Sequence, residues 1–304
     1  MHMLRFRLAQ LTIPLLRHLP RGYARAYKLV LGSYLSSWKA DPYLAAHIRR
    51  RRFRVHWDSQ RKAYFIVDLA DWACRPHYFI GRYYDEIVPM LVDTFLQDGG
   101  TFVDIGANRG IHTLYAAKRL QGKGMVYAFE PHPKTFKVLE AHLTMNQIEN
   151  VAAFNAGLSD EAGTLTLYGG NTHSGTASLL SGNSGEGSSA SDVEIWRLAD
   201  RPDLVPFRGD VLVKIDTEGY ELHVLKGMGS LLDYPQLTVV AEVTDRWLGK
   251  AGGSAREMFD YMRAKGFQAY LPRIQHRVLR KVLALERIEG PRDEEQYDVV
   301  FQRM

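Results

Sequence analysis

The sequence predicts an α/β protein built on a doubly wound parallel sheet. From Glu86 onward, short apolar segments typical of strands alternate with amphipathic segments typical of helices, which indicates a parallel sheet with helices on both faces. The segment DIGANRG, residues 104–110, lies between the first such strand and the next helix, where open α/β sheets hold their ligands. The chain has 304 residues, 46% of them hydrophobic, which suffices for one large core with a small appendage.

Residues 1–84 are predicted to form an N-terminal appendage of helical pieces followed by a β-hairpin. In residues 1–48, leucines recur at helical spacing with basic residues between them. A helix of this kind packs on the protein or on another subunit, or rests on an anionic membrane, and the sequence leaves these alternatives and the oligomeric state open. The alternating segments FRVHW and AYFIV flank the polar segment DSQRK and predict the hairpin.

Residues 85–304 are predicted to form the main domain. Its helices are expected at residues 86–96, 111–120, 133–146, 221–228 and 255–266. Its strands are expected at residues 101–105, 125–130, 151–157, 211–216, 237–243, 268–272 and 297–302. The Gly- and Ser-rich segment 169–192 interrupts this alternation and is either a connector or a lid over a site at the sheet edge.

The composition indicates a reducing compartment. The one cysteine, Cys74, has no partner for an internal disulfide, and no Cys/His cluster offers a zinc site. The net charge of +5 is concentrated in the N-terminal region, whose apolar run is interrupted by Pro14 and Arg17 and does not have the form of a signal peptide. No apolar run approaches the about 18 residues of a membrane-spanning helix. We therefore expect a cytoplasmic protein, with peripheral contact to the inner face of the membrane through the basic N-terminal segment as an alternative.

The turn after the first strand favours one class of ligand over another. A nicotinamide dinucleotide site has three glycines in the pattern GxGxxG, whereas this turn has Gly106 and Gly110 directly behind Asp104. A carboxylate at that position repels a pyrophosphate and attracts a cation, such as the ammonium group of S-adenosylmethionine. Glu130 closes the second strand, where a carboxylate accepts hydrogen bonds from both hydroxyls of a ribose.

Five segments resemble, in the same order, the FkbM-like family of S-adenosylmethionine-dependent methyltransferases. They are FVDIGANRGIHT, AFEPHPKTFKVLEAHLTMN, NAGLSD, GTASLL and VKIDTEGYELHVLKG, and they lie within residues 81–266. The resemblance implies a Rossmann-like class I methyltransferase fold, with a doubly wound seven-stranded sheet whose last strand is antiparallel. It also implies an O-methyltransferase that uses S-adenosyl-L-methionine and acts on a hydroxyl of a saccharide or secondary metabolite.

The resemblance also implies which residues bind the cofactor. The turn would line the methionine half, the end of the second strand the ribose, and the residues after the third strand the adenine. These predicted cofactor-binding residues are Asp104, Gly106, Ala107, Asn108, Gly110, Glu130, Pro131, Gly157 and Leu158. One segment departs from the family pattern: VEIWRLAD has Ala199 and then Asp200, where the family has an acid directly after the leucine.

The end of the fourth predicted strand carries the candidate catalytic residues, which are Lys214, Asp216, Glu218 and Glu221. Methyl transfer is an in-line displacement at a sulfonium, so the protein must align the acceptor hydroxyl and take its proton. Alternation sends Lys214 and Asp216 to one face of the strand, and a lysine inside an apolar strand needs a charged partner. We therefore expect Lys214 to hold a carboxylate and Asp216 to orient or deprotonate the acceptor. The alternative is a structural ion pair at the sheet edge.

Other titratable residues are interpreted less specifically. His112 and His223 are interpreted as surface residues of helices, and His173 as a residue of the Gly/Ser segment that could reach the acceptor. Glu242 either caps a neighbouring turn or faces the site. No metal site is predicted, because there is no DxD pair, although acids at the sheet edge could hold Mg²⁺.

Two functions of other classes remain as alternatives: a nucleotide-binding oxidoreductase, and a non-catalytic, membrane-associated member of the methyltransferase fold. The missing middle glycine disfavours the first. The NPP[YF] motif that grips the amino group of a flipped base is absent, so the expected partner is a small molecule or glycan and not a nucleic acid.

Overall fold

The computed structural model describes residues 52–71, 85–169, 189–277 and 280–303, with residues 46, 48, 50, 74, 77, 78 and 83. The chain divides into two compact units, residues 1–84 and 85–304. Except for Ala46 and Ile48, the helical pieces predicted for residues 1–48 lie outside the described residues, as does His173.

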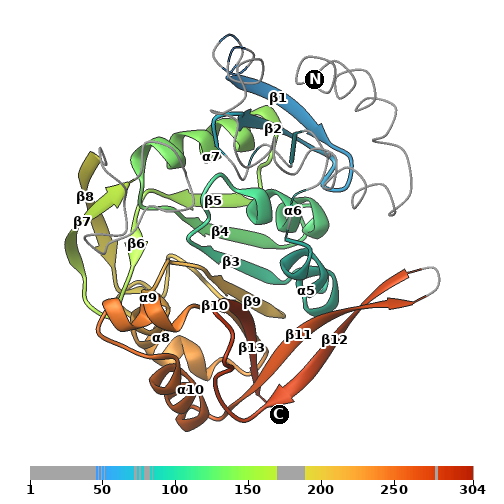
Figure 1. Cartoon of the computed structure of the whole chain (residues 1–304). Coiled ribbons are helices and arrows are strands. Elements are labelled where there is room, and N and C mark those ends of the chain that lie inside the picture. The colour runs from blue at the N-terminus through green and yellow to red at the C-terminus, as the bar shows by residue number, and fades with distance from the viewer. Residues whose placement is uncertain are drawn as a thin grey trace, which may run out of the picture. The chain divides into compact units, whose positions relative to one another are not determined.

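The first unit contains the predicted hairpin (Figure 1). Strand β1 (Phe53–Asp58) pairs antiparallel with β2 (Ala63–Asp68), and Trp57 lies opposite Tyr64. Alternate side chains point to opposite faces, so both of these aromatic side chains are exposed whereas Phe65 is fully buried.

The second unit contains a mixed sheet in the order β12-β11-β13-β10-β9-β3-β4-β5 (Figure 1). Its strands are β3 (Thr101–Ile105), β4 (Met125–Phe129), β5 (Val151–Phe154), β9 (Val211–Ile215), β10 (Leu237–Val243), β11 (Phe267–Arg277), β12 (Arg280–Ile288) and β13 (Tyr297–Arg303). The neighbouring strands β10, β9, β3, β4 and β5 are parallel to one another. Strand β13 is antiparallel to both of its neighbours, β10 and β11, as expected. Along the chain, β4 and β5 are added on one side of β3, and β9 and β10 are then added on its other side. The direction of winding therefore reverses between β3 and β9.

Helices cover both faces of this sheet, which confirms the doubly wound architecture. The helices are α5 (Ile87–Phe95), α6 (Ile111–Leu120), α7 (Pro133–Met145), α8 (Glu221–Met228), α9 (Asp245–Lys250) and α10 (Ala255–Ala264), with short 3₁₀ helices η3 (Leu198–Asp200) and η4 (Gly229–Asp233). On one face, α5 and α6 pack on Phe102 and Leu212; on the other, α8 and α10 pack on the alternating residues Val103 and Val213. No helix in the described part of the chain is both long and apolar enough to cross a bilayer.

Several elements differ from the prediction. The edge strand β12 makes the main sheet eight-stranded rather than seven-stranded. A second sheet has the order β6-β8-β7 and consists of β6 (Gly157–Leu158), β7 (Gly163–Gly169) and β8 (Ser189–Trp196). Residues 189–192, predicted as part of the polar interruption, are strand because they pair with β7. Pairing with a distant strand stabilises these polar residues as strand, although their own sequence does not favour it.

Candidate active site

The turn after β3 needs glycine at both of its glycine positions. Gly106 has φ of 75°, and a Cβ there would lie 1.8 Å from the backbone oxygen of Asp216. Gly110 has φ of 78°, and a Cβ there would lie 2.3 Å from a methyl group of Leu139. The turn therefore presses against the end of β9 on one side and against α7 on the other, which only residues without a side chain permit.

Asp104 lies beneath this turn and is fully buried. One carboxylate oxygen accepts a hydrogen bond from the Thr113 hydroxyl at 2.6 Å, and the other lies 3.3 Å from Nζ of Lys214. Oδ1 makes no hydrogen bond among the described residues, although it lies beside the Lys214 ammonium group. Asp104 therefore positions Lys214 and the first turn of α6, and its contact with the methionine half of a cofactor stays a prediction.

Lys214 links the turn to the fourth strand of the predicted core, β9. Its ammonium group donates a hydrogen bond to the Gly106 carbonyl at 2.9 Å and lies 3.3 Å from carboxylate oxygens of both Asp104 and Asp216. Burial alone would lower the pKa of Lys214, but the Asp216 and Asp104 carboxylates raise it above its ordinary value, so the side chain stays charged. The expected pairing of Lys214 with a carboxylate is confirmed, and two carboxylates take part.

Glu130 is held at the end of β4 by backbone donors from two segments. Its carboxylate accepts from the Asn108 N–H and from the His132 N–H, each at 2.8 Å. Burial raises its pKa to about 7, although those backbone hydrogen bonds and Lys214 act in the opposite direction. Each carboxylate oxygen has a second lone pair, so Glu130 can accept two further hydrogen bonds from a diol. Beside it, Oδ1 of Asn108 is buried with no hydrogen-bond partner among the described residues, as expected of a group that a ligand or water completes.

The predicted adenine residues are less accessible. Gly157 lies against Ile195 and Pro131: a Cβ there would lie 2.7 Å from an Ile195 methyl and 3.5 Å from Pro131 Cβ. Leu158 is 3% exposed and its side chain belongs to the main core, so a contact with adenine would come from its backbone and stays a prediction. Ala107 is also buried, and its N–H donates to the Phe129 carbonyl.

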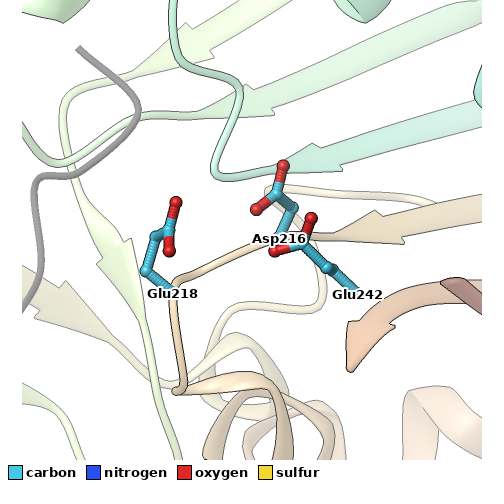
Figure 2. Close-up of side chains that lie close together, drawn as sticks. All are labelled: Asp216, Glu218 and Glu242. Atoms are coloured by element: carbon cyan, nitrogen blue, oxygen red, sulfur yellow. The ribbon is translucent and has the colours of Figure 1, made fainter. Parts of the chain in front are cut away.

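A group of carboxylates lies near the ends of β9 and β10. Ligand atoms of Asp216, Glu218 and Glu242 all lie within 4.8 Å of one another. We call these three residues the acidic cluster (Figure 2). Asp298 lies directly opposite Glu242 in the sheet, on the same face. The cluster could hold a cation, either a positively charged ligand or a metal ion, and Lys214 already supplies one counter-charge to Asp216.

Burial and mutual repulsion change the protonation of these groups. The pKa of Glu218 rises to about 8, because of burial and the charges of Asp216 and Glu221. The pKa of Glu242 rises to about 9 through burial and the charges of Asp216 and Glu218, although Gln296 donates a hydrogen bond to it at 2.6 Å. Without a bound cation, burial and the charge of Asp216 therefore favour the protonated forms of Glu218 and Glu242.

Glu221 is not available for catalysis, contrary to the prediction. It is 2% exposed, and one carboxylate oxygen accepts from the N–H and hydroxyl of Thr217 and from the N–H of Gly219, at 2.9, 3.0 and 3.1 Å. These bonds close the loop between β9 and α8. The loop also includes Glu218, whose φ of 54° lies in the left-handed region.

Neither helix histidine is a plain surface residue, which differs from the prediction. Nε2 of His112 lies 3.1 Å from the Asp85 carboxylate, and the His112 side chain is 11% exposed. Despite burial, His112 and the backbone N–H groups at the start of α5 hold the pKa of Asp85 well below its ordinary value. His223 bridges the Asp160 carboxylate and the Ala251 carbonyl, each at 2.9 Å.

Sequence reasoning missed Asp85 and Asp298 and left Glu242 undecided. Glu242 belongs to the acidic cluster and thus faces the site. The sequence feature that could have indicated this is the position of Glu242 near the end of the strand that follows Asp216. The pairing of Asp298 with Glu242 is set by strand register across a long separation, which the sequence alone does not display.

The sheet order, the glycine turn at the strand-order reversal and Glu130 at the next strand end together define a Rossmann-like methyltransferase fold. Residues 104–269, more than half of the chain, match the model of the methyltransferase FkbM domain. The chain belongs to the FkbM methyltransferase family.

Two relatives carry methyltransferase names. The chain is 34% identical over 154 residues to methyltransferase sdnD of Sordaria araneosa, covering 41% of this chain and 59% of that protein. It is 30% identical over 167 residues to methyltransferase 1 of Beauveria bassiana, covering 49% of this chain and 64% of that protein. The chain thus spans less than two thirds of either relative.

Solved structures with a similar arrangement include methyltransferase FkbM from Methylobacillus flagellatus. That similarity has a TM-score of 0.40 at 14% identity and covers 84% of this chain and 60% of that one. Precorrin-6y C5,15-methyltransferase from Geobacter metallireducens also has a TM-score of 0.40, at 12% identity, covering 71% of this chain and 86% of that one.

Proposed function

We propose that this protein is an S-adenosylmethionine-dependent O-methyltransferase that acts on a hydroxyl of a saccharide or secondary metabolite. The observation that carries the proposal is Glu130, a carboxylate fixed at the end of β4 by two backbone donors and placed beside the glycine turn. Membership of the FkbM family supports the same reading, and the acceptor class follows from the family resemblance.

The site residues fit this cofactor. Two hydroxyls of its ribose match the free lone pairs of Glu130, and its positive charge matches the acidic cluster. S-adenosylmethionine supplies, when bound, a methyl group activated by a sulfonium. The protein's own residues bind and orient the cofactor, align the acceptor and remove its proton.

Asp216 is the proposed proton acceptor. Its side chain is 38% exposed, and Lys214 fixes one of its oxygens from below. Lys214 is in turn fixed by Asp104 and the Gly106 carbonyl, so the carboxylate has a defined direction at the sheet edge. Glu218 lies beside it in the acidic cluster and would be the alternative base, with a pKa near the working pH of an enzyme.

The expected partner is a small molecule or glycan, with no nucleic acid, and a cytoplasmic location remains our expectation. We do not assign a metal to the site. A chelator such as EDTA should therefore leave turnover unchanged, whereas turnover that EDTA abolishes and Mg²⁺ restores would assign a cation to the acidic cluster.

Calorimetry with S-adenosylmethionine, S-adenosylhomocysteine and NADH separates the proposed function from an oxidoreductase. Binding of the first two without NADH is expected, and binding of NADH alone would overturn the proposal. A screen with radiolabelled methyl donor against sugar, glycan and small-molecule pools should then yield a labelled product with the methyl group on oxygen. Cofactor binding without any label transfer would favour the non-catalytic alternative.

A further inference from the structure

One face of the β1–β2 hairpin exposes large apolar side chains. Phe53 and Val55 are each 61% exposed, Trp57 is 46% exposed and Tyr64 is 47% exposed. Phe53, Val55 and Trp57 alternate along β1, and Tyr64 lies opposite Trp57 on β2, so all four share one face. The rings of Trp57 and Tyr64 lie 4.8 Å apart. We call these four residues the aromatic face.

Around the aromatic face, the acidic side chains are buried and the exposed charged side chains are basic. Among residues 52–71, the three acids are all buried: they are Asp58, Asp68 and Asp71, at 0%, 6% and 2% exposure. Asp58 pairs with Arg61 and Asp68 pairs with Arg52. Among the described residues from 50 to 71, the exposed charged residues are all basic. Arg50 precedes β1, Arg52 begins the hairpin and Lys62 lies in its turn, so cations flank the aromatic face at both ends.

Arg52 is partly neutralised, whereas Lys62 has no acid beside it in the turn. The Arg52 guanidinium makes two hydrogen bonds to the Asp68 carboxylate, at 2.8 and 2.7 Å, and lies 5.2 Å from the Phe53 ring. This pairing holds the base of the hairpin together. Among the described residues, the unpaired exposed charges beside the aromatic face are therefore positive and come from Arg50 and Lys62.

We propose that the aromatic face docks the protein on an anionic lipid surface. Tryptophan and tyrosine are the residues that settle at the level of lipid headgroups, and flanking cations bind anionic headgroups. At roughly 200 Å² for a full aromatic side chain, the three half-exposed aromatic side chains present about 300 Å². Even with Val55 added, this area lies below the about 800 Å² per partner of a stable protein interface. A second copy would also bring like charges together. The proposal concerns the hairpin and does not depend on methyl transfer.

The test is co-sedimentation of the full chain with phosphatidylcholine vesicles, with and without phosphatidylglycerol. We expect binding that requires phosphatidylglycerol and weakens as salt rises. Lys62→Gln should lower the partition coefficient about fivefold, and Trp57→Thr, which keeps strand propensity, should lower it about tenfold or more. Leu165→Thr is the matched control, since Leu165 is an exposed strand residue in the other unit, at 37% exposure, and should bind as the unchanged chain does.

A second measurement keeps the test decisive if a variant is less stable. Brominated phosphatidylglycerol vesicles should quench tryptophan fluorescence of the unchanged chain more than that of Trp57→Phe, because Trp57 would enter the lipid. Three outcomes overturn the proposal: no vesicle binding, vesicle binding that Trp57→Thr leaves unchanged, or self-association that Trp57→Thr abolishes without any vesicle binding. The last would assign the aromatic face to a second copy.

Discussion

Asp216 lies at the exposed end of a buried polar chain that runs from Thr113 through Asp104 to Lys214. This chain explains how one carboxylate at a sheet edge acquires a defined direction. Side chains fixed in this way lose little freedom when an acceptor binds, which is what a positioned base requires.

We predict that Asp216→Asn lowers turnover by about 10²- to 10⁴-fold. The amide is nearly isosteric, so melting temperature and cofactor affinity should stay close to those of the unchanged protein. The measurement is turnover, affinity and melting temperature on the same preparation. A large fall in melting temperature with turnover near normal would instead identify a structural ion pair and transfer the role of base to Glu218.

Glu130 should contribute to cofactor binding rather than to the chemical step. We predict that Glu130→Gln raises the dissociation constant of S-adenosylhomocysteine about tenfold or more, because an amide replaces one charged acceptor by a donor. Glu140→Gln, an exposed residue of α7, is the matched control and should bind normally. If calorimetry finds equal affinities for the two variants, Glu130 does not contact the ligand.

At the scale of elements, the decisive contact is the one between the β3 turn and the end of β9. Because residue 106 is glycine, the turn can approach the backbone of Asp216 closely. At this distance Lys214 can donate a hydrogen bond to the Gly106 carbonyl. Cofactor residues and catalytic residues thus belong to two elements that are distant in sequence and joined by one close backbone approach.

We predict that Gly106→Ala lowers the melting temperature strongly and abolishes cofactor binding. Gly122→Ala is a matched control, because both glycines have φ of 75° but a Cβ at Gly122 meets nothing within 4 Å. Both variants carry the strain of a left-handed residue, about 1 kcal/mol, and only Gly106→Ala adds the clash with Asp216. Thermal unfolding of the two variants side by side measures the difference; equal shifts would mean that the turn tolerates a side chain.

At the scale of the whole molecule, the acidic cluster makes stability depend on pH. In the unfolded chain Glu242 loses its proton near its ordinary pKa of 4.5, whereas in the folded chain it holds the proton up to about 9. In that window the folded state binds more protons, so stability falls as pH rises and levels off above the folded pKa.

We therefore predict that the free energy of unfolding of the cofactor-free protein decreases between pH 5 and pH 9, and that Glu242→Gln makes this decrease smaller. Denaturant unfolding at several pH values checks the slope, with Glu140→Gln as a control that keeps it. A saturating cationic cofactor should also reduce the slope, because it stabilises the ionised cluster. A slope that Glu242→Gln does not change would contradict the raised pKa.

Much of the fold could be predicted because local periodicity reports which face of a segment is buried. The helices at 111–120 and 221–228 and the strands at 101–105 and 237–243 have the predicted bounds. The same reasoning failed for β12 and for the polar part of β8, whose strand conformation depends on partners elsewhere in the chain. Periodicity carries no information about those partners.

The alternation of strands and helices, the glycine turn and a carboxylate at the end of the second strand could be predicted from the sequence, because each involves residues that are close neighbours along the chain. Which carboxylates are exposed at the site depends on how distant segments pack. This packing buries Asp104 and Glu221, which accept hydrogen bonds, and brings Asp216, Glu218 and Glu242 together, with Asp298 opposite Glu242. Availability depends on strand register and on neighbouring donors, and these are set when distant segments pack and not by the spacing of residues in one segment.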